Sequence, residues 1–327
     1  RAFERPAAAL AAYESILGIG GGVSLNIAPS YRIGCERSCK KLSKPPRRWK
    51  VPKFRLRLAR EITLYGKRGG SRGWASSRMG SGKRELSVER FVLEELIARE
   101  NTKDMMIGED GQIVVLEPEK EASSGSNSGS HAPSESIAGG WKGEHCENHL
   151  ILTLFGLLTW EALWIDGNPD AFHHGALFSD TPPGLLSGAY DSRQTQAMNA
   201  LVRRIEEDPR AAETVLRSTW QKYRGQQSRG VTWTRFALED LCAVANGLGS
   251  VLCTEILRVF AANGDYSAWS SGAPDLMLWR TRPPWRVKFA EVKGPGDSLS
   301  DSQFAWLDMV VRAGGDATVV KVKVMEG

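Results

Sequence analysis

The chain has 327 residues, of which 41% are hydrophobic and 25% are charged, and its formal net charge is +5. This length is enough for two folded domains. The longest apolar stretch, residues 150–164, contains Thr153, Thr159 and Glu161, so it predicts a buried helix and is too polar and short to span a membrane. We therefore expect no membrane partner, and we find no signal peptide in this sequence.

The positive charge is concentrated near the beginning of the chain. Residues 31–84 contain 18 Lys and Arg against two acidic residues, so this segment carries +16 and the rest of the chain carries −11. Such an asymmetry predicts a basic surface that neutralises nucleic-acid phosphates, and interleaved aromatics such as Trp49 can stack on an unpaired base. For residues 44–53, a solvated basic loop or a localisation signal is an equally good interpretation. The residues that we expect to contact DNA are Arg37, Lys40, Lys41, Arg47, Arg48 and Lys50.

The first two-thirds of the chain is predicted to be mainly helical. Glycine-rich segments at 18–22 and 69–82 predict loops, and the Ser/Gly-rich stretch within 111–140 predicts a disordered insertion. Apolar periodicity and capping residues predict the regular elements. These are a strand at 62–65 and helices at 1–17, 87–100, 148–164, 193–207, 211–223, 233–246 and 250–262.

Residues 145–149 read His-Cys-Glu-Asn-His at the start of the predicted helix 148–164. Two histidines four residues apart share one face of a helix, which suggests a zinc site. A zinc protease, however, needs glutamate directly after the first histidine, and that position is Cys146, so we exclude this class. The five cysteines have no spacing typical of a disulfide or zinc framework, and we expect reduced thiols.

The most informative motif lies near the end of the chain. Asp275 precedes an apolar run at 276–279. After 15 intervening residues, Glu291, Val292 and Lys293 follow a second apolar run. Strand side chains alternate, so Glu291 and Lys293 point to one side and Val292 points to the core. Carboxylates are the hard ligands that Mg²⁺ or Mn²⁺ requires, and a lysine beside them orients a water or offsets phosphoryl charge. An ordinary hairpin with surface charges is the alternative, because the motif is short.

The residues after this motif favour the functional interpretation. Residues 294–297 read Gly-Pro-Gly-Asp and end the strand, and a helix is predicted from about 299 with Ser300 or Ser298 as its cap. Gln303 lies in its first turns and is expected to face the same pocket, which makes it a fourth catalytic candidate beside Asp275, Glu291 and Lys293. A valine-rich strand at 317–324 follows. A hairpin, a helix and a strand in this order fit a small α/β nuclease module.

Residues 272–324 resemble the VRR-NUC domain of the PD-(D/E)xK nuclease superfamily, and the chain from about Cys35 onward resembles the Fanconi-associated nuclease family. The motifs that carry the resemblance are Gly-Ala-Pro-Asp-Leu at 272–276, Glu-Val-Lys-Gly-Pro-Gly-Asp at 291–297, and Leu-Ser with Gln303 and Trp306-Leu307. Weaker matches lie upstream, at 38–41, 87–89, 157–161, 166–172 and 233–236.

The resemblance implies an α+β fold, in which a mainly helical, tetratricopeptide-like region precedes a small α/β nuclease domain. We therefore expect a helical and basic DNA-binding region at 1–110, the insertion at 111–140, a helical region packed on the nuclease at 141–225, and the VRR-NUC domain at 226–327. The sequence shows no clean repeat of its own.

The resemblance also implies a metal site made of Asp275, Glu291, the Val292 carbonyl and a third carboxylate. Counted back from Trp160, Glu147 aligns with the family's glutamate, and helical spacing to Leu150 turns it inward. Glu144 is the competing candidate, because a small shift of the helix start would exchange the two. We expect Glu144 to lie in the loop that leaves the insertion.

The resemblance implies an Mg²⁺- or Mn²⁺-dependent nuclease that cuts branched or 5′-flapped DNA, digests DNA from a 5′ end, and acts in interstrand-crosslink repair in the nucleus. It implies Fanconi-pathway repair proteins as partners, although no segment resembling the family's ubiquitin-binding zinc finger or its SAP-type domain is recognised in these residues. The alternative is a catalytically weak DNA-binding scaffold that retains the nuclease fold. The complete set of Asp275, Glu291 and Lys293 favours the enzyme.

Overall fold

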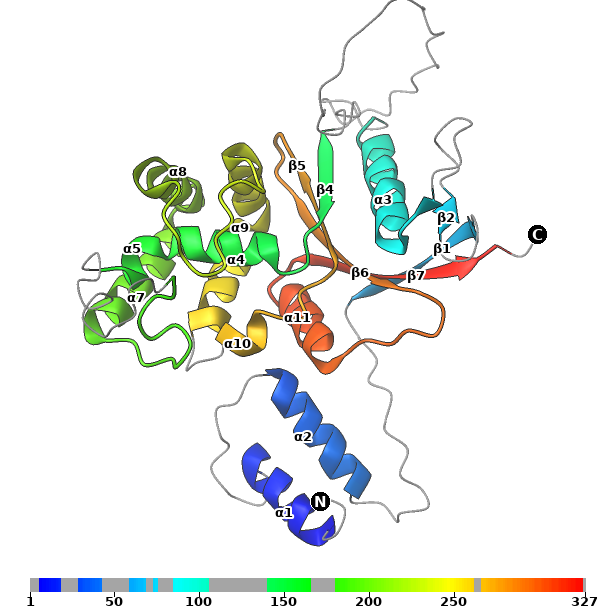
Figure 1. The fold of residues 1–327 in the computed structure, drawn as a ribbon, viewed down its shortest axis with the longest axis horizontal. Helices are drawn as coiled ribbons and strands as arrows, with labels where there is room; N and C mark the ends of the chain where they lie inside the picture. The colour runs from blue at the N-terminus through cyan, green and yellow to red at the C-terminus, as the bar shows by residue number, and fades with distance from the viewer. Residues whose placement is uncertain are drawn as a thin grey trace, which may run out of the picture.

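The computed structural model describes residues 6–18, 29–42, 59–68, 73–75, 85–105, 140–165, 180–261 and 266–325. Within these residues, a seven-stranded sheet crosses the middle of the molecule and has helices on both faces (Figure 1). The order across the sheet is β3-β2-β1-β7-β6-β5-β4. The strands are β1 (Arg60–Arg68), β2 (Trp74–Ala75), β3 (Glu85–Leu86), β4 (Trp141–His145), β5 (Leu276–Arg280), β6 (Val287–Lys293) and β7 (Asp316–Val324).

The strand pairing joins segments that are far apart in the sequence. β7 lies between β1 and β6 and is parallel to both, whereas β5 is antiparallel to β6 and to β4. The sheet that carries the C-terminal motif therefore takes four strands, β1 to β4, from residues 60–145. The division into units at 1–110, 141–225 and 226–327 stays a prediction, but the sheet itself extends beyond the last of these ranges.

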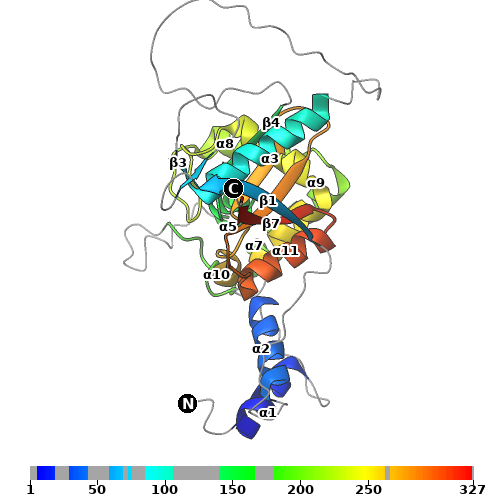
Figure 2. The same cartoon turned by 90° about the vertical axis from the view of Figure 1, so that its right-hand side faces the viewer.

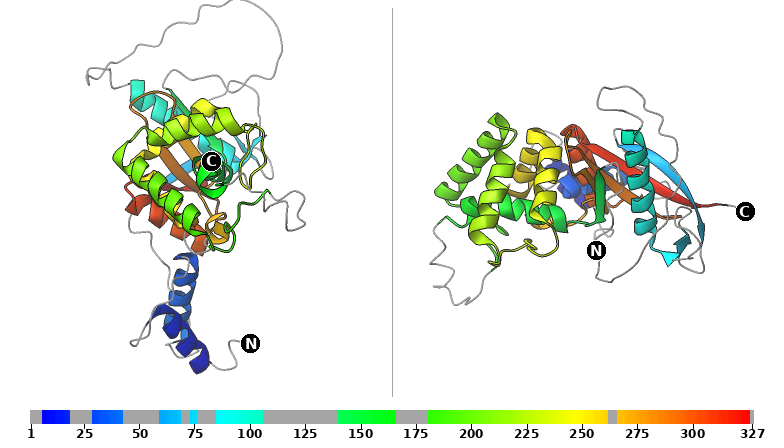
Figure 3. Two further views of the ribbon diagram at one scale, coloured as in Figure 1. Left: turned by 90° about the vertical axis from the view of Figure 1, so that its left-hand side faces the viewer. Right: turned by 90° about the horizontal axis from the view of Figure 1, so that it is seen from above.

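The helices form three groups: two helices that cover the opposite faces of the sheet, a helical hairpin, and a set of helices beside the sheet. α3 (Val88–Met105) lies on one face of the sheet and contacts β4, β5, β6 and β7, and α11 (Asp301–Arg312) lies on the other face. α1 (Pro6–Leu17) and α2 (Pro29–Leu42) form a hairpin that projects below α11 and contacts it through α2 (Figure 2). The third group lies beside the sheet, on the far side from α3 (Figure 3). It consists of α4 (His149–Leu158), α5 (Trp160–Leu163), α7 (Ser192–Glu207), α8 (Ala211–Tyr223), α9 (Leu238–Ala261) and α10 (Tyr266–Trp269).

Strand alternation divides the core between the two faces of the sheet. Ala290 and Val292 of β6 pack under α3 with Phe91, whereas Val287 and Phe289 pack against the cluster that contains Trp306 of α11. Glu291 and Lys293 share the parity of Phe289, so they face α11 and the helical group. This phase places the charged end of β6 between the sheet and α11.

Most of the predicted elements occur, with shifted ends. The predicted helices at 87–100, 193–207 and 211–223 are α3, α7 and α8, and the predicted helix from about 299 is α11 with Ser300 as its cap. The helix predicted at 148–164 is divided into α4 and α5 around Thr159. The two helices predicted at 233–246 and 250–262 begin at Leu238 instead and form one element, α9, with a non-helical kink at Gly249.

Other predictions concern residues outside the described ranges. Nothing is described for residues 106–139, which include most of the predicted disordered insertion, or for 166–179. The mixed helix and sheet content agrees with the expected fold class, whereas the tetratricopeptide-like array stays a prediction.

By length and composition, α9 is apolar and long enough to cross a membrane, counted within the described residues. However, 61% of its apolar window is buried inside the protein, as in a core helix. The central position of α9 between α8, α7, β5 and β6 agrees with that role.

Candidate metal-dependent nuclease site

Asp275 lies directly before β5, where the chain passes close to the start of α11. Gly272 adopts a φ of 85°, and a Cβ atom there would lie 2.6 Å from the Ser302 side chain. Only glycine therefore allows this close approach. The Asp275 carboxylate accepts a 2.8 Å hydrogen bond from the backbone N–H of Val292, which ties the start of β5 to the end of β6.

The end of β6 carries the second carboxylate and the lysine. Glu291 is fully buried, and the Lys293 Nζ lies 2.7 Å from its Oε1 as an ion pair. Apart from this ion pair, neither Glu291 oxygen has a close hydrogen bond of normal geometry with the described residues. Buried carboxylate oxygens normally have hydrogen-bond partners, so these two are candidates to bind a ligand that is not part of the protein.

Gln303 joins this site from the first turn of α11. Its Oε1 accepts from Lys293 Nζ at 3.1 Å and from the backbone N–H of Ser300 at 3.0 Å. Ser300 and Gln303 form a capping box at the start of the helix. The cap that begins α11 therefore also holds the lysine in place.

The surroundings of the two carboxylates disfavour their charged forms. Burial, followed by the nearby Asp275, raises the pKa of Glu291 to about 7, although the ion pair with Lys293 opposes this change. Burial also raises the pKa of Asp275, against the opposing effects of the Val292 N–H and Lys293. Two adjacent acids with raised pKa values and a single neighbouring ammonium would be stabilised by additional positive charge.

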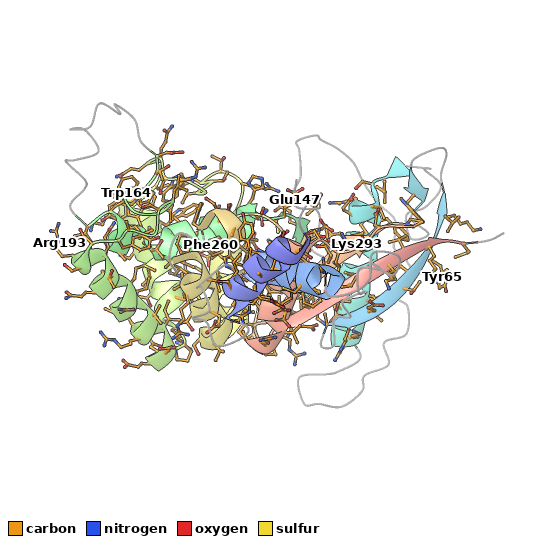
Figure 4. All side chains as sticks on the ribbon, turned by 90° about the horizontal axis from the view of Figure 1, so that it is seen from below. Tyr65, Glu147, Trp164, Arg193, Phe260 and Lys293 are labelled. Atoms are coloured by element: carbon orange, nitrogen blue, oxygen red, sulfur yellow. The ribbon has the colours of Figure 1, made fainter. Side chains whose placement is uncertain are left out.

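Glu147 lies beside this site, but in a conformation that the sequence did not predict. It is a turn residue between β4 and α4 with a φ of 44°, and its N–H donates to the Asp275 carbonyl at 3.2 Å. The helical-register argument for Glu147 is therefore wrong, because α4 begins only at His149. Its exposed carboxylate lies 3.7 Å from His145 Nε2. Figure 4 shows Glu147 and Lys293 between the helical group, which contains Phe260, and the sheet end, which contains Tyr65.

Two further predictions about residues 144–149 are wrong. Glu144 lies in β4 opposite Met277, not in a loop, and its carboxylate binds Arg235 Nε at 3.0 Å. His145 and His149 do not share a helix face, because His145 ends the strand and His149 begins the helix. The strand was missed because its sequence, Trp-Lys-Gly-Glu-His, has little apolar character of its own and follows the Ser/Gly-rich stretch.

Glu89 is an acidic residue near the site that the sequence analysis did not single out as a ligand. It lies in the first turn of α3, is half-buried, and its negative charge contributes to the raised pKa of Asp275. The signal was its place within the Ser-Val-Glu segment that begins a predicted helix. Nothing in that segment alone indicates that α3 would lie over β5 and β6.

The donor set fits a hard divalent cation. Asp275 and Glu291 provide carboxylate oxygens, the Val292 carbonyl is adjacent in the sequence, and the Glu291 oxygens have no normal hydrogen bond. Among the described residues, no three His, Cys, Asp or Glu side chains are already close enough to hold a metal ion. The Glu147 carboxylate, which is exposed and lies near His145, would therefore have to rotate to join Asp275 and Glu291.

The expected DNA-contacting residues are only partly described. The Arg37 side chain forms an ion pair with Asp301, the first residue of α11. Near this pair, a cavity of about 520 Å³ lies between the α1–α2 hairpin and the α10–α11 region, and its lining includes Tyr13, Tyr31 and Ser302. Lys40 and Lys41 lie in α2 without described side chains, and Arg47, Arg48 and Lys50 are outside the described residues.

The cysteines occupy different surroundings. Cys146, Cys242 and Cys253 are buried, and burial raises the pKa of the Cys146 and Cys253 thiols to about 12. Thiols with such pKa values stay protonated near neutral pH and act as small apolar core residues.

Comparisons with known proteins agree with this geometry. Residues 207–324 match the model of the VRR-NUC domain. The Fanconi-associated nuclease 1 homologue of Oryza sativa subsp. japonica is 32% identical over 297 residues, which are 89% of this chain and 26% of the relative. The homologue of Arabidopsis thaliana is 30% identical over 299 residues, which are 89% of this chain and 28% of the relative. The chain thus spans about a quarter of the length of these relatives.

The fold also matches a solved structure. A crystal structure of paFAN1 bound to DNA with a two-nucleotide 5′ flap and a gap matches with a TM-score of 0.66 and 22% sequence identity, over 99% of this chain and 47% of that chain. At this identity the match shows a shared fold. Together, the domain match and the sequence relatives show that this chain contains a VRR-NUC domain and is similar to Fanconi-associated nucleases over most of its length.

Proposed function

We propose that this protein is a divalent-metal-dependent nuclease that hydrolyses phosphodiester bonds in branched or 5′-flapped DNA. The observation that carries the proposal is the fully buried Glu291, whose two oxygens lack normal hydrogen bonds while Asp275 and Lys293 lie beside it. The Lys293 ammonium contacts Oε1, and a purely structural ion pair would also give Oε2 a hydrogen-bond partner. A carboxylate that binds a cation leaves its oxygens available.

Each residue has a role that follows from its surroundings. Asp275, Glu291, the Val292 carbonyl and Glu147 would hold Mg²⁺ or Mn²⁺, and the cation would supply Lewis-acid charge at the scissile phosphate. The Lys293 ammonium is held by Glu291 and Gln303, so it can orient the attacking water and offset charge on the phosphoryl oxygens. Gln303 fixes Lys293 through the capping box.

The basic segment supports a DNA substrate. Residues 31–84 carry +16 in a chain whose net charge is +5, and such a patch neutralises phosphates without reading sequence. We propose that Lys40, Lys41, Arg47, Arg48 and Lys50 contribute to this grip. Arg37 can contribute once DNA phosphates compete with its ion pair to Asp301.

The finer activity is proposed from the relatives. The curated relatives are named Fanconi-associated nuclease 1 homologues, and the matching paFAN1 structure holds 5′-flap DNA. We therefore propose 5′-flap endonuclease and 5′-to-3′ exonuclease activity in the repair of interstrand crosslinks in the nucleus, alongside Fanconi-pathway proteins.

Cleavage of labelled branched DNA tests the proposal. A 5′-flap duplex and its 3′-flap counterpart are each labelled at either end and incubated with the full chain in Mg²⁺, in Mn²⁺ or in EDTA. We expect metal-dependent incision of the 5′-flap substrate, stepwise shortening from 5′ ends, and no products in EDTA. Binding of both substrates without metal-dependent products would contradict the proposal and leave a non-catalytic DNA-binding scaffold.

Charge neutralisation tests the basic segment separately. Changing Lys40, Lys41 and Lys50 to Gln should weaken binding to any DNA sequence. It should also reduce the slope of log K against log salt by about 0.9 for each lost duplex contact. Lys222→Gln is a matched control, because Lys222 is paired with Glu161 in the helical group. An unchanged affinity and slope in the triple variant would mean that the segment does not contact DNA.

A further inference from the structure

Glu147 has a backbone conformation that residues other than glycine rarely adopt. Its φ of 44° lies in the left-handed region, and Glu147 is the one described non-glycine residue with a positive φ. Such a conformation costs roughly 1–3 kcal/mol and persists only when the surrounding structure holds it. The contacts that hold this turn therefore decide where the Glu147 carboxylate lies.

Arg235 makes one set of these contacts from a segment about 90 residues away in the sequence. Its Nε donates to Glu144 Oε1 at 3.0 Å, and its Nη2 donates to the His145 carbonyl at 3.0 Å. One guanidinium thus holds a side chain and a backbone carbonyl at the last two residues of β4. These residues lie directly before the turn, and the planar fork of Arg suits two acceptors at once.

Asn148 makes the second contact on the other side of Glu147. It occupies the N-cap position of α4, where asparagine usually accepts from a backbone N–H of its own helix, yet it makes no such bond. Its Oδ1 accepts instead from the Ala273 N–H at 3.0 Å, two residues before Asp275. The side chain that would stabilise α4 therefore connects the Glu147 turn to the segment that carries Asp275.

Backbone hydrogen bonds complete the attachment. The N–H groups of Cys146 and Glu147 both donate to the Asp275 carbonyl at 3.2 Å. The Arg235 and Asn148 contacts hold the residues on either side of Glu147.

We propose that Arg235 and Asn148 are positioning residues that keep Glu147 in its left-handed turn beside Asp275, so that its carboxylate can join the cation held by Asp275 and Glu291. This inference rests on the proposed metal-dependent function. Neither residue touches the reacting atoms, and each acts through Glu147. Removing either contact loosens the turn that carries Glu147, whereas the Val292 N–H still holds the Asp275 carboxylate and Glu291 stays in β6.

Metal affinity is the measurement that a merely structural role would not change. Mn²⁺ binding to the full chain is measured by isothermal titration calorimetry, and DNA cleavage is measured across Mn²⁺ concentrations. For Arg235→Gln and for Asn148→Ala we expect a 10- to 100-fold higher Kd for Mn²⁺, the size found for groups that orient metal ligands, with cleavage recovering at saturating Mn²⁺. Arg235→Lys, which keeps the charge but not the fork, should fall between these variants and the wild type.

Two controls separate positioning from folding and from an effect elsewhere. Arg217→Gln removes an arginine that binds Glu213 and Glu239 between α8 and α9, and its Kd for Mn²⁺ should stay within twofold of wild type. The second control combines Arg235→Gln with Glu147→Gln. If Arg235 acts through Glu147, its effect on Kd should disappear in the Glu147→Gln background.

The outcomes divide as follows. If the wild type neither binds Mn²⁺ nor cleaves DNA in its presence, both the proposed function and this inference fail. If the wild type does both but Arg235→Gln and Asn148→Ala bind Mn²⁺ like wild type, only the positioning inference fails. It also fails if Arg235→Gln weakens Mn²⁺ binding by the same factor with and without Glu147→Gln. A loss of folding in Arg235→Gln, seen as a lower Tm, leaves Asn148→Ala and Arg235→Lys to decide by the same criteria.

Discussion

The end of β6 and the turn between β4 and α4 each carry a carboxylate of the proposed site, but these carboxylates are positioned by different means. At the end of β6, alternation along one strand places Glu291 and Lys293 on one face and Val292 on the other. In the turn, Glu147 is placed by a left-handed backbone and by contacts from distant segments. The first arrangement is inherent in a short stretch of sequence, and the second exists only in the folded protein.

This difference implies different responses to mutation. A change in the strand pair removes a buried candidate ligand, or Lys293, which is the one cation paired with Glu291 among the described residues. A change in the turn moves an exposed carboxylate that other groups support. We therefore expect the strand to tolerate almost no change and the turn to show graded effects that high metal concentration reverses.

The largest effect is expected at the two central carboxylates. Asp275→Asn or Glu291→Gln should reduce cleavage at least about 10³-fold, because a metal ion supplies several kcal/mol at the transition state and each 1.36 kcal/mol is a factor of ten. Initial rates on 5′-end-labelled flap DNA measure this effect, and DNA affinity should change little. Asp308→Asn, which removes an acid paired with Arg312 on α11, is the control. Near wild-type cleavage in either site variant would remove these residues from the mechanism.

A somewhat smaller loss is expected for the lysine. Lys293→Met should lower the cleavage rate roughly 10²- to 10³-fold, the cost of losing one preorganised group that stabilises developing charge. Unlike the turn variants, it should not recover at high Mn²⁺, because the ammonium acts on water and phosphate. Single-turnover rates across Mn²⁺ concentrations make this test. Full recovery at high Mn²⁺ would show that Lys293 serves only to hold Glu291.

Glu147 and Glu144, the two acidic residues near the turn, should differ clearly in their effect on cleavage. Glu147→Gln should slow cleavage about 10- to 100-fold at low Mn²⁺, whereas Glu144→Gln should have a smaller effect because it weakens only one of the two Arg235 bonds. Rates at low and saturating Mn²⁺, measured for both variants in parallel, provide the comparison. If only Glu144→Gln loses activity, the third carboxylate has been assigned to the wrong residue.

Gln303 tests how much the start of α11 contributes to the position of Lys293. Gln303→Ala removes the acceptor that orients Lys293 and half of the capping box, so we expect about a tenfold slower reaction together with a loss of about 1 kcal/mol in the free energy of unfolding. Ser300→Ala is the control, because it weakens the cap without touching Lys293. Equal losses of activity in the two variants would assign the whole effect to the helix cap.

The last prediction concerns stability and not cleavage, and it is a pH dependence of unfolding in EDTA. The pKa of Glu291 is about 7 in the folded protein against a reference value of 4.5, so between these values the folded state binds a proton that the unfolded state has lost. The free energy of unfolding should therefore fall as pH rises from about 4.5 to 7, by up to about 3 kcal/mol from this group. Urea unfolding of wild type and Glu291→Gln at several pH values isolates this contribution. A wild-type minus variant difference that does not change with pH would contradict the buried, proton-binding state of Glu291.

Several features of the protein follow from short stretches of the sequence. The spacing of Asp275, Glu291 and Lys293 predicted a hairpin with the charged side chains on one face, and β5 and β6 have this arrangement. Ser300, which the sequence offered together with Ser298 as the cap of a helix from about residue 299, begins α11, and it can do so because a capping box needs only four consecutive residues. In each case, interactions between residues close in sequence are strong enough to specify the local conformation.

The remaining features depend on contacts between distant segments. Trp141–His145 forms a strand because β5 offers it an edge, and Arg60–Arg68 extends the sheet because β7 does. The place of Glu147 depends on Arg235 and Asn148, and the influence of Glu89 depends on how α3 lies over the sheet. Local pattern could fix which residues form the strand pair, because alternation is a property of one strand. Only the tertiary structure could decide which distant carboxylates join that pair, because their positions are set by hydrogen bonds and packing between segments more than 80 residues apart.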